Sequence, residues 1–332
     1  MEAINTIEIA VNIFLQSLGT WLHVIMEFIT NLGSEMFFIL AMPALYWCVD
    51  AYIGLRVSMM LLLSGALNNI FKLLFRTPRP YWTDSRVIPV VHESSFGLPS
   101  GHSMYSASVW GWMAVEAKKR WAGIVCIIII FLIGLSRLVM GVHFLSDVLS
   151  GWLLGGLLVW VFSKVQKPVG KRLKKLKINQ QVLLAFATSI ILILLSLFAR
   201  NLYPDWVLRP DWAVRAGEID PLSVDGTLTM AGTWFGMLAG FAILRQKYGI
   251  LNTKTTAWKL LARYIFGSIG VFVIYLGLGQ SFKALSELIN VIFVEALLRY
   301  FRYALIGFWV SLFAPLLFQK MKLGELNFDT IK

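Results

Sequence analysis

The sequence predicts an all-α membrane protein, a polytopic helical bundle with about nine transmembrane helices. Hydrophobic residues make up 58% of the 332 residues, and charged residues only 14%. Long apolar runs recur along the chain, for example at 121–135 and 181–199, and a bilayer span needs about twenty such residues. The alternative, a very apolar soluble helical bundle, does not explain why these runs recur over the whole length.

Hydropathy predicts the spans in order along the chain, at 34–50, 54–76, 100–117, 121–140, 143–163, 180–199, 230–245, 260–280 and 299–319. This count puts the N-terminus outside and the C-terminus in the cytoplasm. Residues 4–31 are apolar but interrupted by polar groups, which is typical of interfacial amphipathic helices. If that segment crosses the membrane instead, there are ten spans and the N-terminus lies inside.

The chain has no recognisable linker, repeat or low-complexity tract, so we expect a single membrane domain over 1–332. Residues 34–163 form its expected catalytic core, and 180–319 supply additional helices. The polar segment 200–230 carries five acidic residues, three arginines and three prolines. Its composition predicts an ordered loop or cap outside the membrane.

The net charge of +12 suggests a nucleic-acid partner until the positions of the basic residues are considered. Seventeen of them lie in 117–121, 164–177, 245–259 and the tail from 320, whereas 1–33, 77–99, 200–230 and 281–297 hold six. The poor and rich segments alternate, which is the positive-inside pattern of a membrane protein. We therefore expect no nucleic acid, and we expect the basic loops to meet anionic lipid headgroups in the cytoplasm.

The absence of recognisable processing signals suits a bacterial inner membrane. The N-terminal 33 residues lack the basic start of a cleavable signal peptide, and the chain has no Asn-x-Ser/Thr sequon. Cys48 and Cys126 are assigned to two different predicted spans, so a disulfide between them is not expected.

Four short motifs carry the chemistry of this chain. Lys72 lies seven residues before Arg79-Pro80, and Pro99-Ser100-Gly101-His102 follows about twenty residues later. Ser136-Arg137 then leads to His143 and Asp147. The predicted topology places every motif at an outer helix end, so loop charge and motif position agree on one outward-facing site.

The residue types in these motifs are those that bind and cleave a phosphate ester. Lys72, Arg79 and Arg137 are cations for phosphate oxygens. Ser100 and Gly101 begin a predicted helix, where backbone amides can face an anion. His143 and Asp147 are four residues apart and share a helical face, so the carboxylate can hold one imidazole nitrogen protonated and leave the other free to attack.

A phosphohistidine mechanism follows from this inventory. His143 attacks phosphorus while the three cations stabilise the charge on its oxygens. His102 protonates the leaving group and then activates the water that hydrolyses the intermediate. A metal site built from His102, His143 and Asp147 is the alternative, but three permanent cations repel a metal, so we expect neither a metal nor another cofactor.

The motifs resemble the type 2 phosphatidic acid phosphatase superfamily, whose pattern is Lys-x6-Arg-Pro, Pro-Ser-Gly-His and Ser-Arg-x5-His-x3-Asp. The matching positions are Lys72, Arg79, Pro80, Pro99, Ser100, Gly101, His102, Ser136, Arg137, His143 and Asp147. The resemblance covers about 34–163 and implies a metal-independent phosphatase with a phosphohistidine intermediate. The nine-helix layout and Arg79-Pro80-Tyr81-Trp82 are similar to glucose-6-phosphatase.

These observations predict a hydrolase that removes phosphate from a lipid phosphate monoester or diphosphate, such as a phosphatidic acid-like lipid or a polyprenyl diphosphate, at the outer membrane face. A sugar phosphatase resembling glucose-6-phosphatase is the second interpretation. A non-catalytic transporter or scaffold with the same fold is the third, and a haloperoxidase is the least favoured. The expected partners are the phosphate ester and membrane lipids; the sequence leaves the oligomeric state open.

Overall fold

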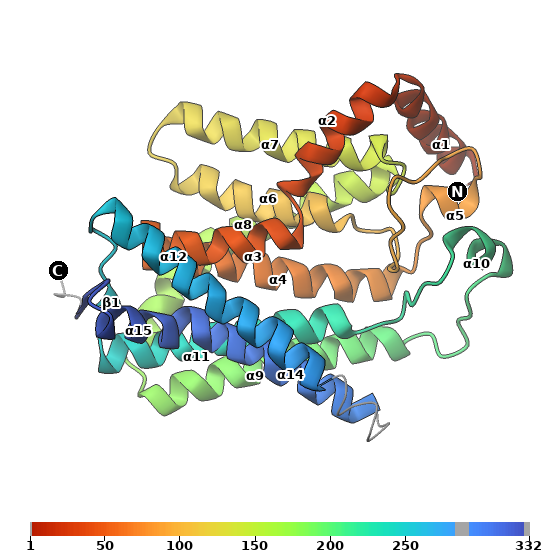
Figure 1. The fold of residues 1–332 in the computed structure, drawn as a ribbon. Helices are drawn as coiled ribbons and strands as arrows, with labels where there is room; N and C mark the ends of the chain where they lie inside the picture. The colour runs from red at the N-terminus through yellow and green to blue at the C-terminus, as the bar shows by residue number, and fades with distance from the viewer. Residues whose placement is uncertain (1, 283–291, 329–332) are drawn as a thin grey trace. The chain divides into compact units, whose positions relative to one another are not determined.

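The computed structural model describes residues 2–282 and 292–328, and in these residues every element is helical except for one short β-ribbon (Figure 1). Packing divides the chain into two units, 1–38 with 67–164 and 195–224, and 39–66 with 165–194 and 225–332. Each unit is described by itself below. The prediction of a single membrane domain stays a prediction.

The first unit contains the N-terminal helices and the helices that carry the motifs. Its complete elements are α1 (Glu2–Ser17), α2 (Thr20–Asn31), α5 (Pro80–Thr83), α6 (Gly101–Glu116), α7 (Arg120–Val139) and α10 (Pro210–Ala216). It shares α3 (Glu35–Ala44), α4 (Ala51–Phe75), α8 (Leu145–Leu173) and α9 (Ile178–Asn201) with the second unit. Within it, α7 packs against α1, α2 and α6.

The second unit contains the C-terminal elements. They are the π-helical turn η1 (Leu45–Val49), α11 (Asp225–Lys247), β1 (Ile250–Leu251), α12 (Ala257–Phe272), η2 (Val273–Leu278), α14 (Ile292–Phe308), η3 (Trp309–Phe313), α15 (Ala314–Lys320) and β2 (Leu326–Asn327). Helix α11 lies against α14 and η3, and α12 contacts η1.

The predicted fold class is confirmed: the chain is a polytopic helical membrane protein. Seven of the described helices are long and apolar enough to cross a membrane, and the bent pair α1–α2 makes eight if it counts as one span. The predicted spans at 34–50 and 100–117 correspond to shorter helices, because α3 with η1 ends at Val49 and α6 has 16 residues.

The N-terminal segment is two helices that meet at an angle of 107°. The break falls at Gly19, whose φ of +110° is a backbone conformation that favours glycine over any other residue. Residues 4–31 therefore do not form one straight span. Their predicted position in the membrane interface stays a prediction.

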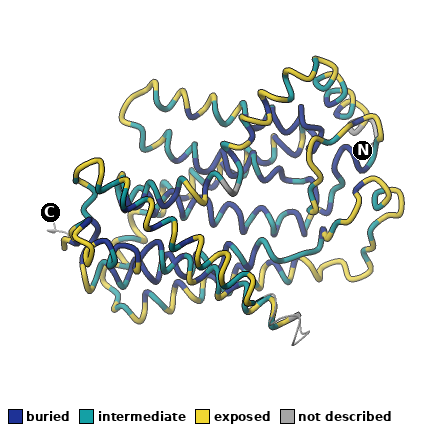
Figure 2. The backbone as a smooth tube through the Cα atoms, viewed as in Figure 1, coloured by how far each residue is buried: buried dark blue, intermediate teal, exposed yellow. Residues whose placement is uncertain are grey.

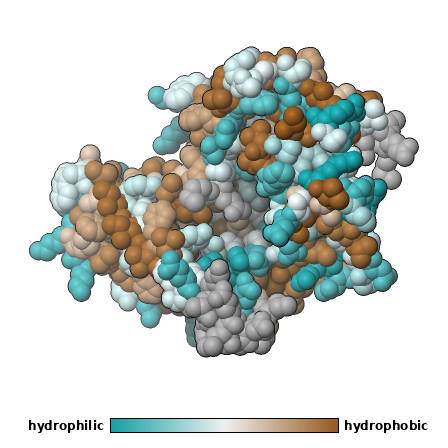
Figure 3. Space-filling model, turned by 45° about the vertical axis from the view of Figure 1, so that its right-hand side comes forward, coloured by the Kyte–Doolittle hydropathy of each residue, from teal (hydrophilic) through white to brown (hydrophobic). Residues whose placement is uncertain are grey.

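Several long helices expose their apolar side chains. Only 39% of the apolar window of α7 is buried, 28% of that of α9 and 17% of that in Ala257–Phe282, and exposed residues follow these helices in Figure 2. Brown apolar side chains also spread over much of the face seen in Figure 3. Because a soluble protein would bury such surfaces, these faces are the ones that meet lipid.

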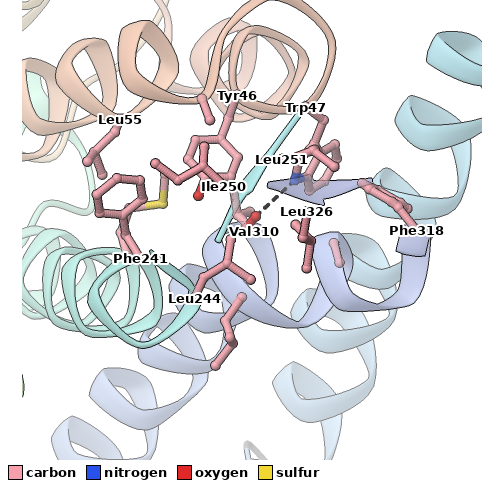
Figure 4. Close-up of a cluster of buried hydrophobic side chains, with 14 of the residues drawn as sticks. Tyr46, Trp47, Leu55, Phe241, Leu244, Ile250, Leu251, Val310, Phe318 and Leu326 are labelled. Atoms are coloured by element: carbon pink, nitrogen blue, oxygen red, sulfur yellow. Dashed lines mark hydrogen bonds between the residues drawn. The ribbon is translucent and has the colours of Figure 1, made fainter. Parts of the chain in front are cut away.

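The core of the second unit gathers around η1 and η3 (Figure 4). Trp47 is fully buried and donates its indole N–H to the carbonyl of Val310 over 2.8 Å, and Phe318 meets its ring edge-on. Strands β1 and β2 pair antiparallel beside this core, with Leu251 opposite Leu326. The sequence did not predict this ribbon, because two-residue strands are too short to show an alternating pattern.

Residues 202–224 connect α9 to α11 and pack on the loop after α4, and the predicted loop at 200–230 also includes the end of α9 and the first residues of α11. Trp206 meets Phe96 edge-on, and Trp212 lies against Trp82, which is completely buried. Arg76 donates to the carbonyls of residues 199, 200 and 203. These contacts fix the loop that carries Arg79.

Candidate active site

His143 lies in the short loop between α7 and α8, and Asp147 lies in the first turn of α8. Asp147 Oδ2 is 3.1 Å from His143 Nδ1 and accepts a second hydrogen bond from the backbone amide of Phe144. On the other side of the ring, Nε2 is 3.2 Å from Nη1 of Arg79. Because a guanidinium only donates, Nε2 carries the lone pair and Nδ1 carries the proton.

Electrostatics favour the same state of His143, whose side chain is 2% exposed. Burial, followed by the charges of Arg79, Lys72 and Arg137, holds the pKa of His143 well below its usual range. The imidazole is therefore neutral near pH 7 and has a free lone pair on Nε2. This is the state that a nucleophile requires.

Arg79 is the centre of the cation cluster and is completely buried. Its guanidinium donates to the carbonyls of Ser95, Phe96 and Val142. Lys72, in the last turn of α4, donates to Ser95 Oγ over 2.8 Å, and Arg79 Nη2 approaches the same oxygen at 3.1 Å. One hydroxyl thus brings together two cations that are seven residues apart in sequence.

Arg137 lies at the end of α7 and is paired with a carboxylate that the sequence analysis did not select. Its Nη2 is 2.6 Å from Glu93 Oε1, and Arg79 Nη2 is 3.8 Å from the other oxygen of Glu93. Arg137 Nη1 donates to Thr30 of α2. Two of the three predicted cations therefore contact the carboxylate of Glu93, and Lys72 lies within electrostatic reach of it.

Glu93 is held in this place by its own backbone. The Tyr81 hydroxyl donates to the Glu93 carbonyl and accepts from the Glu93 amide. Burial opposes ionisation of this carboxyl, but the charges of Arg79 and Arg137 outweigh it and hold the pKa of Glu93 far below its usual range. Glu93 is therefore ionised at neutral pH and occupies the position in which three cations attract an anion.

The Pro-Ser-Gly-His motif begins α6 as the sequence predicts, although its serine amide has another partner. Ser100 is the N-cap of α6: its Oγ accepts from Ser103, and its N–H donates to the carbonyl of Asp147 over 2.9 Å. The amide expected to face an anion is therefore occupied. Gly101 is the first residue of α6, where the backbone amide has no partner within the helix.

His102 follows on the same helix, and its imidazole makes no hydrogen bond to any residue that the structure describes. It lies within electrostatic reach of Arg137, Glu93 and Lys72. Helix α8 approaches the start of α6 closely because its facing residues are glycines: a Cβ at Gly151 would come within 2.8 Å of the Ser100 carbonyl. This close packing keeps Asp147 beside the Pro-Ser-Gly-His turn.

A second group of residues that sequence reasoning missed lies on α1. Glu8, Asn12 and Gln16 are spaced by four and share one face of the helix. Asn12 donates to the carbonyls of Leu138 and His143 over 2.9 and 3.1 Å. Glu8 accepts from the amide and hydroxyl of Ser146, and Gln16 bonds to residues 88 and 139. The polar face of α1 therefore holds the loop that carries His143.

We expect Asn12→Leu to lower kcat by roughly ten- to a hundredfold with little change in KM, because a displaced nucleophile loses its alignment while the cations remain. Initial rates of the detergent-purified variant on its best substrate would measure this. Ile7→Ala, at an exposed position of the same helix, is the control. An unchanged kcat, or a change in KM alone, would show that α1 does not position the loop.

Sequence signals for the missed residues were present but weak. The four-residue spacing of Glu8, Asn12 and Gln16 was visible, but it is equally typical of a helix lying at the membrane interface. Glu93 and Ser95 lie in a loop without periodicity, between two motifs. Among the described residues, no group of three or more His, Cys, Asp or Glu side chains can hold a metal ion.

Comparison with known proteins finds family matches in two regions of the chain. Residues 53–171 match the model of the PAP2 superfamily, and 228–326 match that of the PAP2 superfamily phosphatase transmembrane extension. Phosphatidylglycerophosphatase B of Bacillus subtilis is 34% identical over 154 residues, which cover 42% of this chain and 73% of that protein. The chain belongs to the PAP2 superfamily. The resemblance drawn from the motifs is confirmed, and the protein is a metal-independent membrane phosphatase.

Two further similarities were found. Glucose-6-phosphatase 3 of Bos taurus is 28% identical over 243 residues, covering 64% of this chain and 69% of that protein. The crystal structure of a PAP2-type phosphatidylglycerolphosphate phosphatase from Bacillus subtilis is 29% identical and covers 51% of this chain and 89% of that chain, with a TM-score of 0.45. The similarity to glucose-6-phosphatase extends beyond the region that holds the motifs.

Proposed function

We propose that this PAP2 phosphatase hydrolyses a lipid phosphate monoester or diphosphate through a phosphohistidine at His143. One observation carries the proposal: Asp147 binds Nδ1 of the ring, while Nε2 points at Arg79 within the cation cluster. A phosphate drawn to Lys72, Arg79 and Arg137 meets the lone pair of Nε2 directly.

In the first step, Nε2 of His143 forms a bond to phosphorus as the bond from phosphorus to the leaving oxygen breaks. The cations stabilise the charge on the phosphoryl oxygens, and the amide of Gly101 at the start of α6 adds a donor. The negative charge of the bound phosphate ester favours the protonated form of His102, which gives its proton to the leaving oxygen. The carboxylate of Asp147 stabilises the positive charge that develops on the His143 ring.

In the second step, His102 takes a proton from water, and the water oxygen bonds to phosphorus as the Nε2–phosphorus bond breaks. Inorganic phosphate leaves, and both histidines return to their starting states. Glu93 must give up its contact with Arg137 or share it for phosphate to enter. The hydrolysis therefore uses groups of this chain alone.

A lipid substrate is favoured by the surface next to the site. Helix α7 carries Arg137 at its end, and it exposes Ile127, Ile128 and Phe131, each by at least half. An acyl or prenyl tail can lie along this apolar helix while its phosphate reaches the cations. The relative that shows the family is also named for a lipid phosphate.

The test is phosphate release by the detergent-purified protein from a panel of phosphatidic acid, phosphatidylglycerophosphate, a polyprenyl diphosphate and glucose 6-phosphate. We expect turnover of at least one lipid that survives EDTA and is blocked by vanadate, which adopts the trigonal-bipyramidal shape of the transition state. Activity lost in EDTA and restored by zinc or magnesium would overturn the mechanism.

A sugar phosphatase is the second candidate, because the similarity to glucose-6-phosphatase 3 covers 64% of this chain. The chemistry at His143 would be the same, and only the group attached to phosphorus would differ. Turnover of glucose 6-phosphate with no turnover of any lipid in the panel would establish this function in place of the first.

We further propose that the protein lies in a bacterial inner membrane with its site toward the periplasm. The segments 118–120, 164–177 and 245–259 are rich in Lys and Arg and therefore belong in the cytoplasm. The segments 77–99 and 200–230 belong outside. This orientation gives the enzyme access to lipids of the outer leaflet.

Labelling of single cysteines with an impermeant thiol reagent tests this orientation in cells whose outer membrane is permeabilised. The background variant lacks Cys48 and Cys126, which are both free. We expect cysteine at Ser94 to label and cysteine at Lys174 to stay unlabelled until the cells are lysed; both positions are exposed. Labelling at 174 alone would invert the protein and place catalysis in the cytoplasm.

A further inference from the structure

A hollow of about 540 Å³ lies in the second unit, and none of its lining residues belongs to the site described above. It is lined by the segment between β1 and α12, the first turns of α12, and the chain from the end of α15 to β2. Its volume is within the range of small-molecule sites. No step of the proposed hydrolysis uses these residues.

The charges around the hollow favour an anion. Lys254, Lys259, Lys322 and Arg263 line it, against the single carboxylate of Glu325. None of the four cations forms an ion pair with any carboxylate in 2–282 or 292–328. Four unpaired cations around one concave surface raise the local concentration of anions.

Arg263 distinguishes this hollow from an ordinary basic surface, because it is 1% exposed. Its Nε donates to the carbonyl of Leu323 and its Nη1 to that of Trp47, while Nη2 has no hydrogen-bond partner among the described residues. Gly324 leaves room beside Nη2, since a Cβ there would lie 2.7 Å from it. A buried guanidinium without a counter-charge is costly, and a bound anion would supply that charge.

The surroundings place this hollow at the depth of lipid headgroups. Helix α12 begins next to it and exposes Trp258, Leu261 and Ile265 by 62%, 60% and 46%. Tryptophan at the start of an apolar, lipid-facing helix is typical of the membrane interface. The loop before α12 is also among the basic loops that the charge pattern assigns to the cytoplasm, where anionic lipids are abundant.

We propose that this hollow binds the phosphate group of an anionic phospholipid, with Arg263 Nη2 and the three lysines as its ligands. Free phosphate has the same chemistry, but it would gain nothing from the apolar face of α12. The inference concerns a lipid bound at a second site and does not depend on the proposed substrate.

The test compares binding of dioleoylphosphatidylglycerol, dioleoylphosphatidylcholine and inorganic phosphate to the full-length protein in detergent, measured from the thermal shift in titrations. The variant Lys254→Ala/Lys259→Ala/Lys322→Ala removes the lysines and leaves Arg263 and the core unchanged. The control Lys171→Ala/Lys174→Ala/Lys175→Ala removes the same charge from the basic segment at the end of α8. Both variants keep the His143 site, so phosphatidylglycerol bound there contributes equally to each.

We expect the hollow variant to bind phosphatidylglycerol at least about tenfold more weakly, since each lysine near an anionic headgroup contributes roughly fivefold, and the control to bind as the natural sequence does. Arg263→Gln should weaken binding similarly. If the triple variant at 254, 259 and 322 and the control lost affinity equally, the effect would come from surface charge in general, and the proposed site would be wrong. If inorganic phosphate raised the unfolding temperature as much as phosphatidylglycerol does, the hollow would be an anion site, but a lipid would not be its specific occupant.

Discussion

Replacing His143 with alanine should lower phosphate release by at least about 10⁴-fold, because no other group can replace the nucleophile of a mutually dependent set. The imidazole fixes the path of attack: Nδ1 is bound to Asp147, and Nε2 faces Arg79. With alanine at 143 the cation cluster stays intact, so the variant should still bind vanadate. Initial rates together with vanadate protection against thermal unfolding would separate lost chemistry from lost binding.

The control for this prediction is His23→Ala, because His23 lies on α2 and its imidazole Nε2 has no hydrogen-bond partner among the described residues. His102→Ala gives a further distinction. With p-nitrophenyl phosphate, whose leaving group needs no proton, this variant should form the phosphoenzyme and hydrolyse it slowly. An alkali-stable label on His102→Ala and none on His143→Ala would support the assignment. Near-normal turnover of His143→Ala would show that His143 is not the nucleophile.

Sequence motifs can indicate which residues of this candidate site lie near one another, because the motifs define local geometry. Four-residue spacing placed Asp147 on the face of His143, and the Pro-Ser-Gly-His motif does begin a helix. Long helices with motifs at their ends bring distant residues into one layer once the topology is known. The two cations of the first motif and the histidine–aspartate pair could therefore be assigned to a common site from spacing and loop charge.

The remaining parts of the site depend on tertiary contacts that no spacing encodes. Ser95 links Lys72 to Arg79, and Glu93 lies against Arg137, but both residues come from an irregular loop. Asn12 reaches the carbonyl of His143, 131 residues away in sequence. The amide of Ser100 is used by Asp147, which only the packing of α6 on α8 reveals. Polar residues in loops and on amphipathic helices have many possible partners, and the fold selects one.

The fold shows the same division between local and long-range information. Composition and hydropathy were sufficient for a polytopic helical membrane protein. The predicted spans at 34–50 and 100–117 correspond to helices shorter than a full span, because a hydropathy window does not sense where a helix ends. The β-ribbon of residues 250–251 and 326–327 joins segments about 75 residues apart, and its two-residue strands have no detectable sequence pattern.

Asp147→Asn should lower kcat by about a hundredfold or more with KM nearly unchanged. In the natural sequence, Oδ2 accepts hydrogen bonds from both His143 Nδ1 and the Phe144 amide. If the asparagine turns its NH₂ toward the ring, the proton moves to Nε2, the attacking lone pair is lost, and two N–H groups face each other across the 3.2 Å between His143 and Arg79. If it turns its oxygen instead, geometry is kept but the negative charge that stabilises the phosphorylated ring is gone.

The matched control is Asp84→Asn, which removes the same charge from a carboxylate paired with Arg86 over 2.7 Å in the loop that follows α5. Steady-state kinetics of both variants, with thermal unfolding to verify folding, would measure the difference. Because Asp147 acts through His143, the loss should appear in phosphoenzyme formation and not in vanadate affinity. A kcat within about threefold of the natural value would mean that the loop held by α1 orients His143 without the carboxylate, since Asn12 and Arg79 would then suffice.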